Sequence, residues 1–122
     1  MPHKNKTKEY QAIIINLLQD YDTHWGNIEG LKNRIIADIE TNTFVFLTYG
    51  WQNSETYTHL LCFHLEIIEG TIWIHENNTD AMIVIDLIQK GVAPEDIVIG
   101  FEKQPILSIS GSSVLALNQK SN

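Results

Sequence analysis

Two histidines and a glutamate are the residues whose spacing most directly suggests chemistry. His64 lies in a predicted strand before Glu69-Gly70, and His75 lies in the predicted strand after it. If Glu69-Gly70 are the two loop residues of a hairpin, the register places His64 directly opposite His75, with Glu66 one step away diagonally. Imidazole and carboxylate groups are common metal ligands. We favour a half-exposed polar pair on a sheet surface, because the sequence places no further ligand beside them.

The single cysteine is the second candidate for chemistry. Cys62 has no partner for an internal disulfide and cannot alone build a thiolate zinc site. It lies two residues from His64 on the same predicted strand face, which suggests a thiolate nucleophile. The pattern shows no positive environment that would activate the thiol, so we predict a buried or interface thiol.

The usual catalytic motifs are missing from the sequence. It contains no glycine-rich phosphate loop, no Gly-x-Ser-x-Gly and no His-Glu-x-x-His. The adjacent acids Glu95 and Asp96 follow Pro94 and are more typical of the start of a helical turn. We therefore expect a protein that is not an enzyme and that uses no cofactor and no metal.

Charge distribution argues against direct binding to a duplex. The chain has 122 residues and a formal net charge of −7. Residues 51–102 contain one base, Lys90, and nine acids: Glu55, Glu66, Glu69, Glu76, Asp80, Asp86, Glu95, Asp96 and Glu102. Phosphate contacts need a basic surface. The start of the chain is basic at Lys4, Lys6 and Lys8, so direct DNA binding stays as an alternative, although we expect no strong direct DNA binding.

Length and composition indicate one cytoplasmic domain. A chain of 122 residues with 43% hydrophobic residues buries one core without disulfides. No apolar run is long enough to cross a bilayer, and the first residues do not read as a signal peptide. We expect a single domain over residues 1–122, with a core of about 7–103, a basic start and a polar C-terminal tail.

The elements that must position these residues form an α+β pattern. An apolar stripe from Tyr10 to Tyr21 predicts a helix that begins near Asn5 or Thr7 and frays near Asp22, before a loop over 23–30. Short links then predict a four-stranded antiparallel meander. A second helix over 80–90, capped by the cluster 77–79 and ended by Gly91, precedes a short C-terminal strand. The predicted strands are 31–40, 43–51, 57–68, 71–76 and 97–101, and 106–122 adds a short strand and a polar end.

The second face of this sheet is unusually apolar. A Thr41-Asn42 turn that pairs Glu40 with Thr43 places Phe44 and Phe46 on the core face of the sheet. The opposite face then also carries apolar and aromatic side chains, and Cys62 falls on it beside His64. Such a face favours self-association or a partner over a solvated surface, although loops or the C-terminal tail could cover it within the monomer. The candidate interface residues are Tyr49, Trp51, Asn53, His64, Glu66, Trp73 and His75.

Several short motifs lie along the chain in a specific order and spacing. They are Gly50-Trp51-Gln52-Asn53, His64, Gly70-Thr71-Ile72-Trp73-Ile74, Asn78-Thr79-Asp80 and Gly91-Val92-Ala93-Pro94-Glu95-Asp96-Ile97-Val98-Ile99-Gly100-Phe101. Each motif is weak alone, but together they span roughly residues 9–103 and resemble the XisI family, the fdxN element excision controlling factors of cyanobacteria. The tail beyond Gln104 and the residues Ser54, Glu55 and Thr56, where the family commonly has basic residues, depart from that pattern.

The resemblance implies a small α+β protein that acts with XisH, a companion with an endonuclease-like fold, in programmed excision of a DNA element. On this basis we expect a non-catalytic controlling or accessory protein with an XisH-like partner. The apolar second face of the sheet separately leads us to expect a homo-oligomer, a dimer. The alternatives are a direct DNA-binding recombination factor and a metal-binding enzyme that uses His64 and His75.

Overall fold

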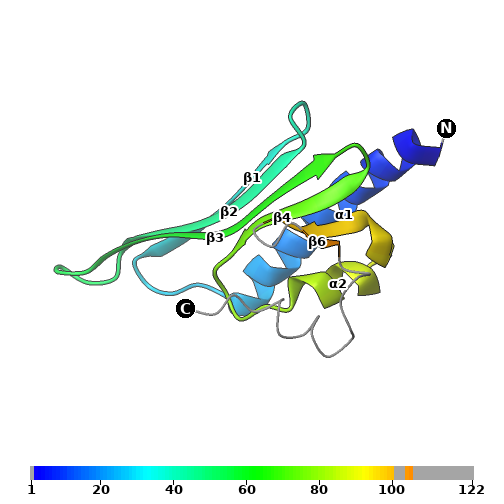
Figure 1. Ribbon diagram of the computed structural model, residues 1–122. Coiled ribbons are helices and arrows are strands. Elements are labelled where there is room, and N and C mark those ends of the chain that lie inside the picture. The colour runs from blue at the N-terminus through cyan, green and yellow to red at the C-terminus, as the bar shows by residue number, and fades with distance from the viewer. Residues whose placement is uncertain (1, 101–103, 106–122) are drawn as a thin grey trace.

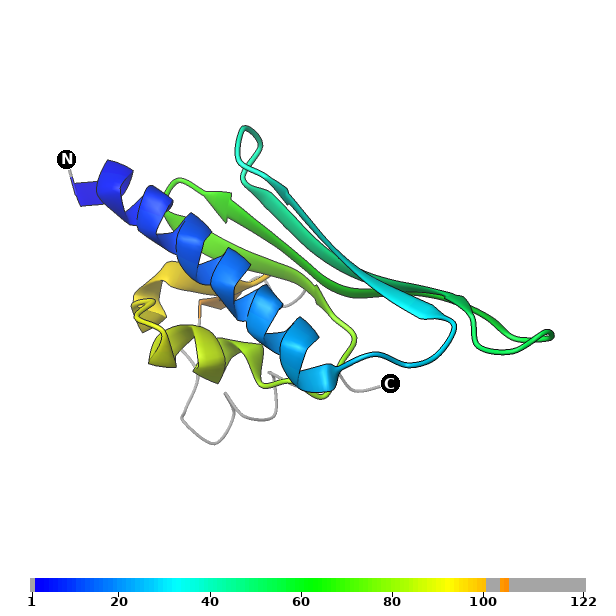
Figure 2. The same cartoon turned by 180° about the vertical axis from the view of Figure 1, so that it is seen from behind.

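The molecule is a twisted sheet with its helices on one side. The computed structural model describes residues 2–100 and 104–105, shown from opposite sides in Figures 1 and 2. Six strands follow one another in the order β1 to β6, and the expected α+β class is confirmed. The elements are α1 (Pro2–Trp25), β1 (Leu31–Asp38), β2 (Thr43–Trp51), β3 (Tyr57–Ile68), β4 (Thr71–Asn77), α2 (Ile83–Gln89), the 3₁₀ turn η1 (Pro94–Asp96), β5 (Ile97–Ile99) and β6 (Gln104–Pro105).

Helix α1 follows the predicted apolar stripe and is longer than predicted. Tyr10 and Tyr21 mark the ends of the buried stripe. The helix begins at Pro2, before the expected caps, and continues to Trp25. Its last turn is held by tertiary contact, because the Trp25 ring stacks on Tyr21 at a centroid distance of 5.2 Å and on Phe63 at 6.0 Å. That contact explains why 23–25 are helical where the sequence predicted a loop.

The turns of the meander are set by local chemistry. Glu69 and Gly70 have φ values of 50° and 79°, as a type I′ hairpin requires, and the predicted Ile68–Thr71 pairing is confirmed. In the first hairpin β1 ends at Asp38 rather than at residue 40, and the connection is the four-residue segment 39–42. Asn42 supplies the positive φ, at 54°. The register is shifted by two residues from the prediction, an even number, so the side chains keep their predicted faces.

Two β-bulges break the register of β3. One lies between Phe46 and Leu47 on β2, where Cys62 is the extra residue, and the other between His64 and Leu65, where His75 is the extra residue on β4. A bulge shifts the alternation of side chains by one. Both interruptions change which residues face one another at the candidate site.

The core lies between the sheet and the two helices. Phe44, Phe46, Phe63 and Leu65 are fully buried on the inner face of the sheet, and α1 and α2 cover that face (Figures 1 and 2). Burying side chains of this size stabilises the fold by roughly 1.5–3 kcal/mol each.

The chain returns to the sheet through α2. This helix begins at Ile83, not at residue 80, because Asn77 caps no helix: its side-chain oxygen accepts from the backbone N–H and hydroxyl of Thr79, which forms a turn. Gly91 ends the helix as predicted, with φ +114°. Strand β5 then pairs parallel with β4, so the sheet is mixed. The predicted fifth strand is shorter than expected, and 106–122 lie outside the described residues.

The β2–β3 hairpin projects beyond both helices (Figures 1 and 2). At its base two backbone segments approach closely, since a Cβ on Gly50 would lie 2.1 Å from the carbonyl oxygen of Gly30. Only glycine permits this approach. Within the ranges 2–100 and 104–105, no helix has the length and apolar character needed to cross a membrane.

Candidate protein-binding face

The side of the sheet that points away from α1 and α2, which we call the outer face, carries many apolar and aromatic side chains together with charged ones. No element of the described residues packs on it: the contacts of α1 are with α2 and with the opposite side of the sheet, as Figure 1 shows. The register places these residues on it: Ile36, Val45, Leu47, Tyr49, Trp51, Tyr57, Leu61, His64, Glu66, Ile68, Trp73 and His75. Apolar surface of this extent on one sheet face is typical of an interaction site.

The most exposed part of the outer face lies at the end of the projecting hairpin. Trp51 and Tyr57 pair across β2 and β3, and their rings meet edge to face at 5.2 Å. The two residues are 56% and 52% exposed. Large aromatic side chains of this kind are frequent anchors of protein interfaces.

A histidine–carboxylate cluster lies at the other end of the outer face. The rings of His64 and His75 are 4.7 Å apart, and His75 Nε2 lies 2.9 Å from Glu66 Oε1. The sequence correctly predicted that these three side chains are neighbours. Burial, and then the nearby His75, lower the pKa of His64. His64 is therefore neutral at pH 7.

The predicted register within this cluster is wrong. His64 pairs with Glu76 and not with His75, because the bulge makes His75 the extra residue of β4. The two rings remain in contact because the bulged residue points to the same side of the sheet. No group of three or more His, Cys, Asp or Glu side chains in the part of the chain that the structure describes is arranged to hold a metal ion. This geometry gives the metal-binding alternative no support.

Cys62 lies on the inner side of the sheet, which corrects its predicted place beside His64. It is the extra residue of the first bulge, and this turns its side chain toward the helices, where it is 3% exposed. Burial raises the pKa of the thiol. The prediction of a buried thiol is confirmed, and the nucleophile interpretation has no support because the thiolate is disfavoured.

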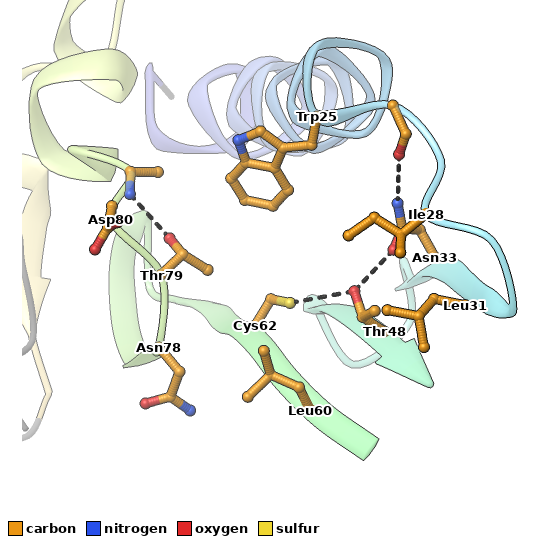
Figure 3. Close-up of a pocket in the computed structure, with 12 residues that line it drawn as sticks. Trp25, Ile28, Leu31, Asn33, Thr48, Leu60, Cys62, Asn78, Thr79 and Asp80 are labelled. Atoms are coloured by element: carbon orange, nitrogen blue, oxygen red, sulfur yellow. Dashed lines mark hydrogen bonds between the residues drawn. The ribbon is translucent and has the colours of Figure 1, made fainter. Parts of the chain in front are cut away.

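A cavity of about 480 Å³ lies beside Cys62, and sequence reasoning missed it (Figure 3). Trp25 at the end of α1 forms one wall and Leu60 on β3 another, and both are 39% exposed. Inside, the Thr48 hydroxyl donates to Asn33 Oδ1 over 2.8 Å and lies 3.5 Å from the Cys62 sulfur. The volume suits one small organic molecule or one large apolar side chain. No motif marks this cavity, because its walls come from four separate segments.

The basic start of the chain is used in part for folding. Lys6 Nζ lies 3.0 Å from Asp96 Oδ2, and this hydrogen bond and charge raise the pKa of Lys6. The Tyr10 hydroxyl donates to the same oxygen over 2.6 Å. These contacts join α1 to η1, so the Lys6 side chain already has a carboxylate partner within the fold.

Comparison with known proteins decides the family. The family model described as XisI protein matches residues 4–114, which extends beyond the 9–103 that carry the sequence motifs. The chain belongs to the XisI family. The fold of a XisI-like protein from Anabaena variabilis is similar, with a TM-score of 0.71 and 29% sequence identity over 77% of this chain and 85% of that chain. The fdxN element excision controlling factor XisI from the same organism gives a TM-score of 0.66 and 26% identity over 79% and 86% of the two chains. Among curated proteins, the sequence has no match.

The XisI motif at residues 50–53 is largely explained by folding. Gly50 permits the close backbone approach to Gly30 described above. The Asn53 side-chain oxygen accepts hydrogen bonds from the backbone N–H groups of Glu55 and Thr56 at 2.8 and 3.0 Å. Asn53 therefore shapes the hairpin loop, and its place in an interface stays a prediction. Trp51, by contrast, has its side chain in solvent.

The other XisI motifs divide in the same way. Asp96 joins η1 to α1 as described, and Pro94-Glu95-Asp96 form the predicted helical turn. Gly100 lies beside the outer-face rings of β4, where a Cβ would lie 3.1 Å from the His75 ring and 3.4 Å from the Trp73 ring. Trp51 and Trp73 are thus the motif side chains that folding explains least, and both belong to the outer face.

Proposed function

We propose that this protein is a non-catalytic controlling factor in the excision of a DNA element, and that it acts by binding a protein partner through the outer face. Membership of the XisI family supports the process, since a structural relative is named fdxN element excision controlling factor. The proposed partner is an XisH-like protein with an endonuclease-like fold.

The observation that carries the proposal is the outer face itself. A sheet in a small α+β domain normally buries one face and solvates the other. Here the second face presents the exposed Trp51 and Tyr57 at one end and the partly buried Trp73 near the other. Aromatic side chains exposed in this density are costly in water and are stabilised when a partner buries them.

Charge supports a basic partner. The acids of residues 51–102 outnumber the single base of that segment, and the formal net charge of the whole chain is −7. A partner that handles DNA carries basic surface, so the two proteins attract each other before they touch. Association should then slow as salt rises, because salt screens the attraction.

The test is co-expression with an XisH-like protein, followed by gel filtration with light scattering. We expect a complex of defined mass. Trp51→Glu and Trp73→Glu should each weaken it by about ten-fold or more, because each places a charge in a desolvated contact. Met82→Glu is the matched control, since Met82 is a 38% exposed apolar residue next to α2.

The outcomes separate the parts of the proposal. A complex that forms equally well with both tryptophan variants would support the XisH-like partner and contradict the outer face as its binding site. Two separate peaks under all conditions would contradict the XisH-like partner. Thermal unfolding of each isolated variant checks the fold, and a large loss of stability in Trp73→Glu would mean that Trp73 is a core residue.

A further inference from the structure

Strand β1 is the border of the sheet, and its free edge is open to pairing. Within the described residues it pairs with β2 alone, and Figure 2 shows it along the rim of the sheet. Natural edge strands are commonly kept short, bulged, interrupted by proline or protected by charged side chains, and of these devices β1 has only the charges of Lys32, Arg34 and Asp38. β1 has eight residues, Leu31–Asp38, without proline, glycine or a register shift. Its length and regularity are those of a strand that can accept another strand.

The charges of β1 follow a self-complementary pattern. Leu31 and Asn33 line the cavity and Ile35 packs on the core, so the alternate residues lie on the outer face. In order, the residues at these alternate positions are Lys32, Arg34, Ile36 and Asp38, and Glu40 follows in the turn. The first half of the strand is basic and the last half acidic, with Ile36 at the centre.

We propose that β1 pairs antiparallel with β1 of a second copy of this chain, with a two-fold axis at Ile36. This register places Arg34 opposite the partner's Asp38, and symmetry repeats that contact. Lys32 lies opposite Glu40 of the second copy, in the turn that follows its β1. Directly opposed charges of opposite sign stabilise a strand pair, whereas like charges destabilise it.

Other arrangements of the same strands fit less well. A parallel, in-register pair would set Lys32 and Arg34 beside their own copies. An antiparallel pair shifted by two residues, centred at Ile35, would place Lys32 opposite Asp38 but would leave Arg34 opposite Ile36 and diagonal to the second Arg34. Only the axis at Ile36 places both basic residues of β1 opposite acidic ones.

The present surroundings of these side chains leave their charges available. Arg34 donates a hydrogen bond to the Tyr49 hydroxyl over 3.3 Å, which is a neutral acceptor. Asp38 accepts from the backbone N–H of Glu40 and from the Thr41 hydroxyl, which fix the carboxylate at the strand end. Among the described residues, neither Arg34 nor Asp38 takes part in an ion pair. Ile36, at the centre, is 48% exposed, and pairing would bury it against its copy.

Pairing of this kind has a consequence for binding. A two-fold axis perpendicular to the sheet leaves the outer faces of the two copies on the same side, joined into one surface. The dimer would then present two aromatic hairpins to its partners. The proposal does not depend on the proposed function, since it concerns β1 alone.

The test uses charge reversal in two complementary variants, measured by sedimentation velocity from about 1 to 100 μM protein. Arg34→Glu opposes glutamate to Asp38, and Asp38→Lys opposes lysine to Arg34, so each variant alone should be monomeric or dissociate about ten-fold or more readily than wild type. Mixed in equal amounts, the two variants should form a heterodimer, because both symmetric contacts then join opposite charges. Lys8→Glu, an equal charge change on an exposed residue of α1, should dimerise like wild type.

Three results would overturn the proposal. These are a wild-type chain that stays monomeric at 100 μM, single variants that dimerise as wild type does, and a mixture that forms no heterodimer although thermal unfolding shows both variants folded. Rescue in the mixture cannot arise from a general effect on stability. It therefore separates strand pairing at β1 from association through the outer face.

Discussion

The Tyr21 hydroxyl on α1 donates a hydrogen bond of 2.5 Å to Asp86 Oδ2 on α2. Burial of the Tyr21 ring and this hydrogen bond raise the pKa of the hydroxyl far above its ordinary value, so it stays protonated and donates throughout the physiological range. The same ring stacks on Phe63 at 5.2 Å. One residue therefore connects both helices to the inner face of the sheet.

Replacing Tyr21 by phenylalanine tests the hydrogen bond apart from the ring. Tyr21→Phe should lower the free energy of unfolding by about 1–2 kcal/mol, because the Asp86 carboxylate loses a donor in a partly buried site. Urea unfolding followed by circular dichroism measures the change. Tyr49→Phe is the control, since the Tyr49 hydroxyl contacts Arg34 on the exposed face, and it should cost less than about 0.5 kcal/mol. Equal stability of Tyr21→Phe and wild type would show that the hydrogen bond contributes nothing.

The close approach of Gly50 to Gly30 at the base of the projecting hairpin gives the second prediction. Gly50 has φ +140°, and an added Cβ would lie 2.1 Å from the backbone oxygen of Gly30. Gly50→Ala should therefore destabilise the fold by more than about 2 kcal/mol, because backbone must move. Gly26 also has positive φ, at +72°, but nothing lies within 4 Å of its Cβ position. Gly26→Ala should cost only about 1–2 kcal/mol from conformation alone. A Gly50→Ala protein no less stable than Gly26→Ala would contradict the close approach.

The features that the sequence predicted best are set by local chemistry. Glu69-Gly70 and Gly91 fix a turn and a helix end through the backbone angles they adopt, and the apolar stripe of α1 needs only its own spacing. Face assignments in the first hairpin are also correct, since an error of two residues leaves the alternation intact.

The features that it missed depend on residues far apart in the chain. The bulge at Cys62 inserts one residue in β3 relative to β2, and no local signal at Cys62 marks it. The bulge at His75 in turn replaces His64 by Glu76 as a pairing partner. Trp25 extends α1 only because Phe63 lies beneath it. The cavity follows from these same events, so it could not be predicted from a pattern in one segment.

The buried thiol gives the third prediction. Burial raises the pKa of Cys62, and a hydrogen-bond contact with Thr48 opposes this in part. Iodoacetamide at pH 8 should therefore modify Cys62 in the folded protein more than about 100-fold more slowly than in urea. Mass spectrometry of timed samples measures both rates. Because the unfolded thiol ionises first, stability should also fall as the pH rises above about 9. Comparable modification rates in the two states would show that the cavity opens to reagent.

The histidine cluster gives the fourth prediction, a loss of stability in acid. His64 faces His75, Glu66 and Glu76; burial and then His75 lower its pKa, while the two carboxylates act in the opposite direction. A histidine whose pKa is lowered in the folded state binds its proton more readily when unfolded. Its contribution to stability is therefore present above the ordinary histidine pKa of about 6.5 and is lost as the pH falls through the lower, folded value.

Two variants separate His64 from the other acid-sensitive groups. His64→Gln should reduce the loss of stability between pH 7 and pH 5, measured by urea unfolding at both values, because only the difference from wild type belongs to His64. His75→Gln removes the neighbouring charge and should raise the pKa of His64, which NMR titration of its ring protons follows directly. A pKa of His64 that does not move in His75→Gln would assign its shift to burial alone. A pKa at or above the ordinary value in the wild-type protein would contradict the environment that the outer face gives this ring.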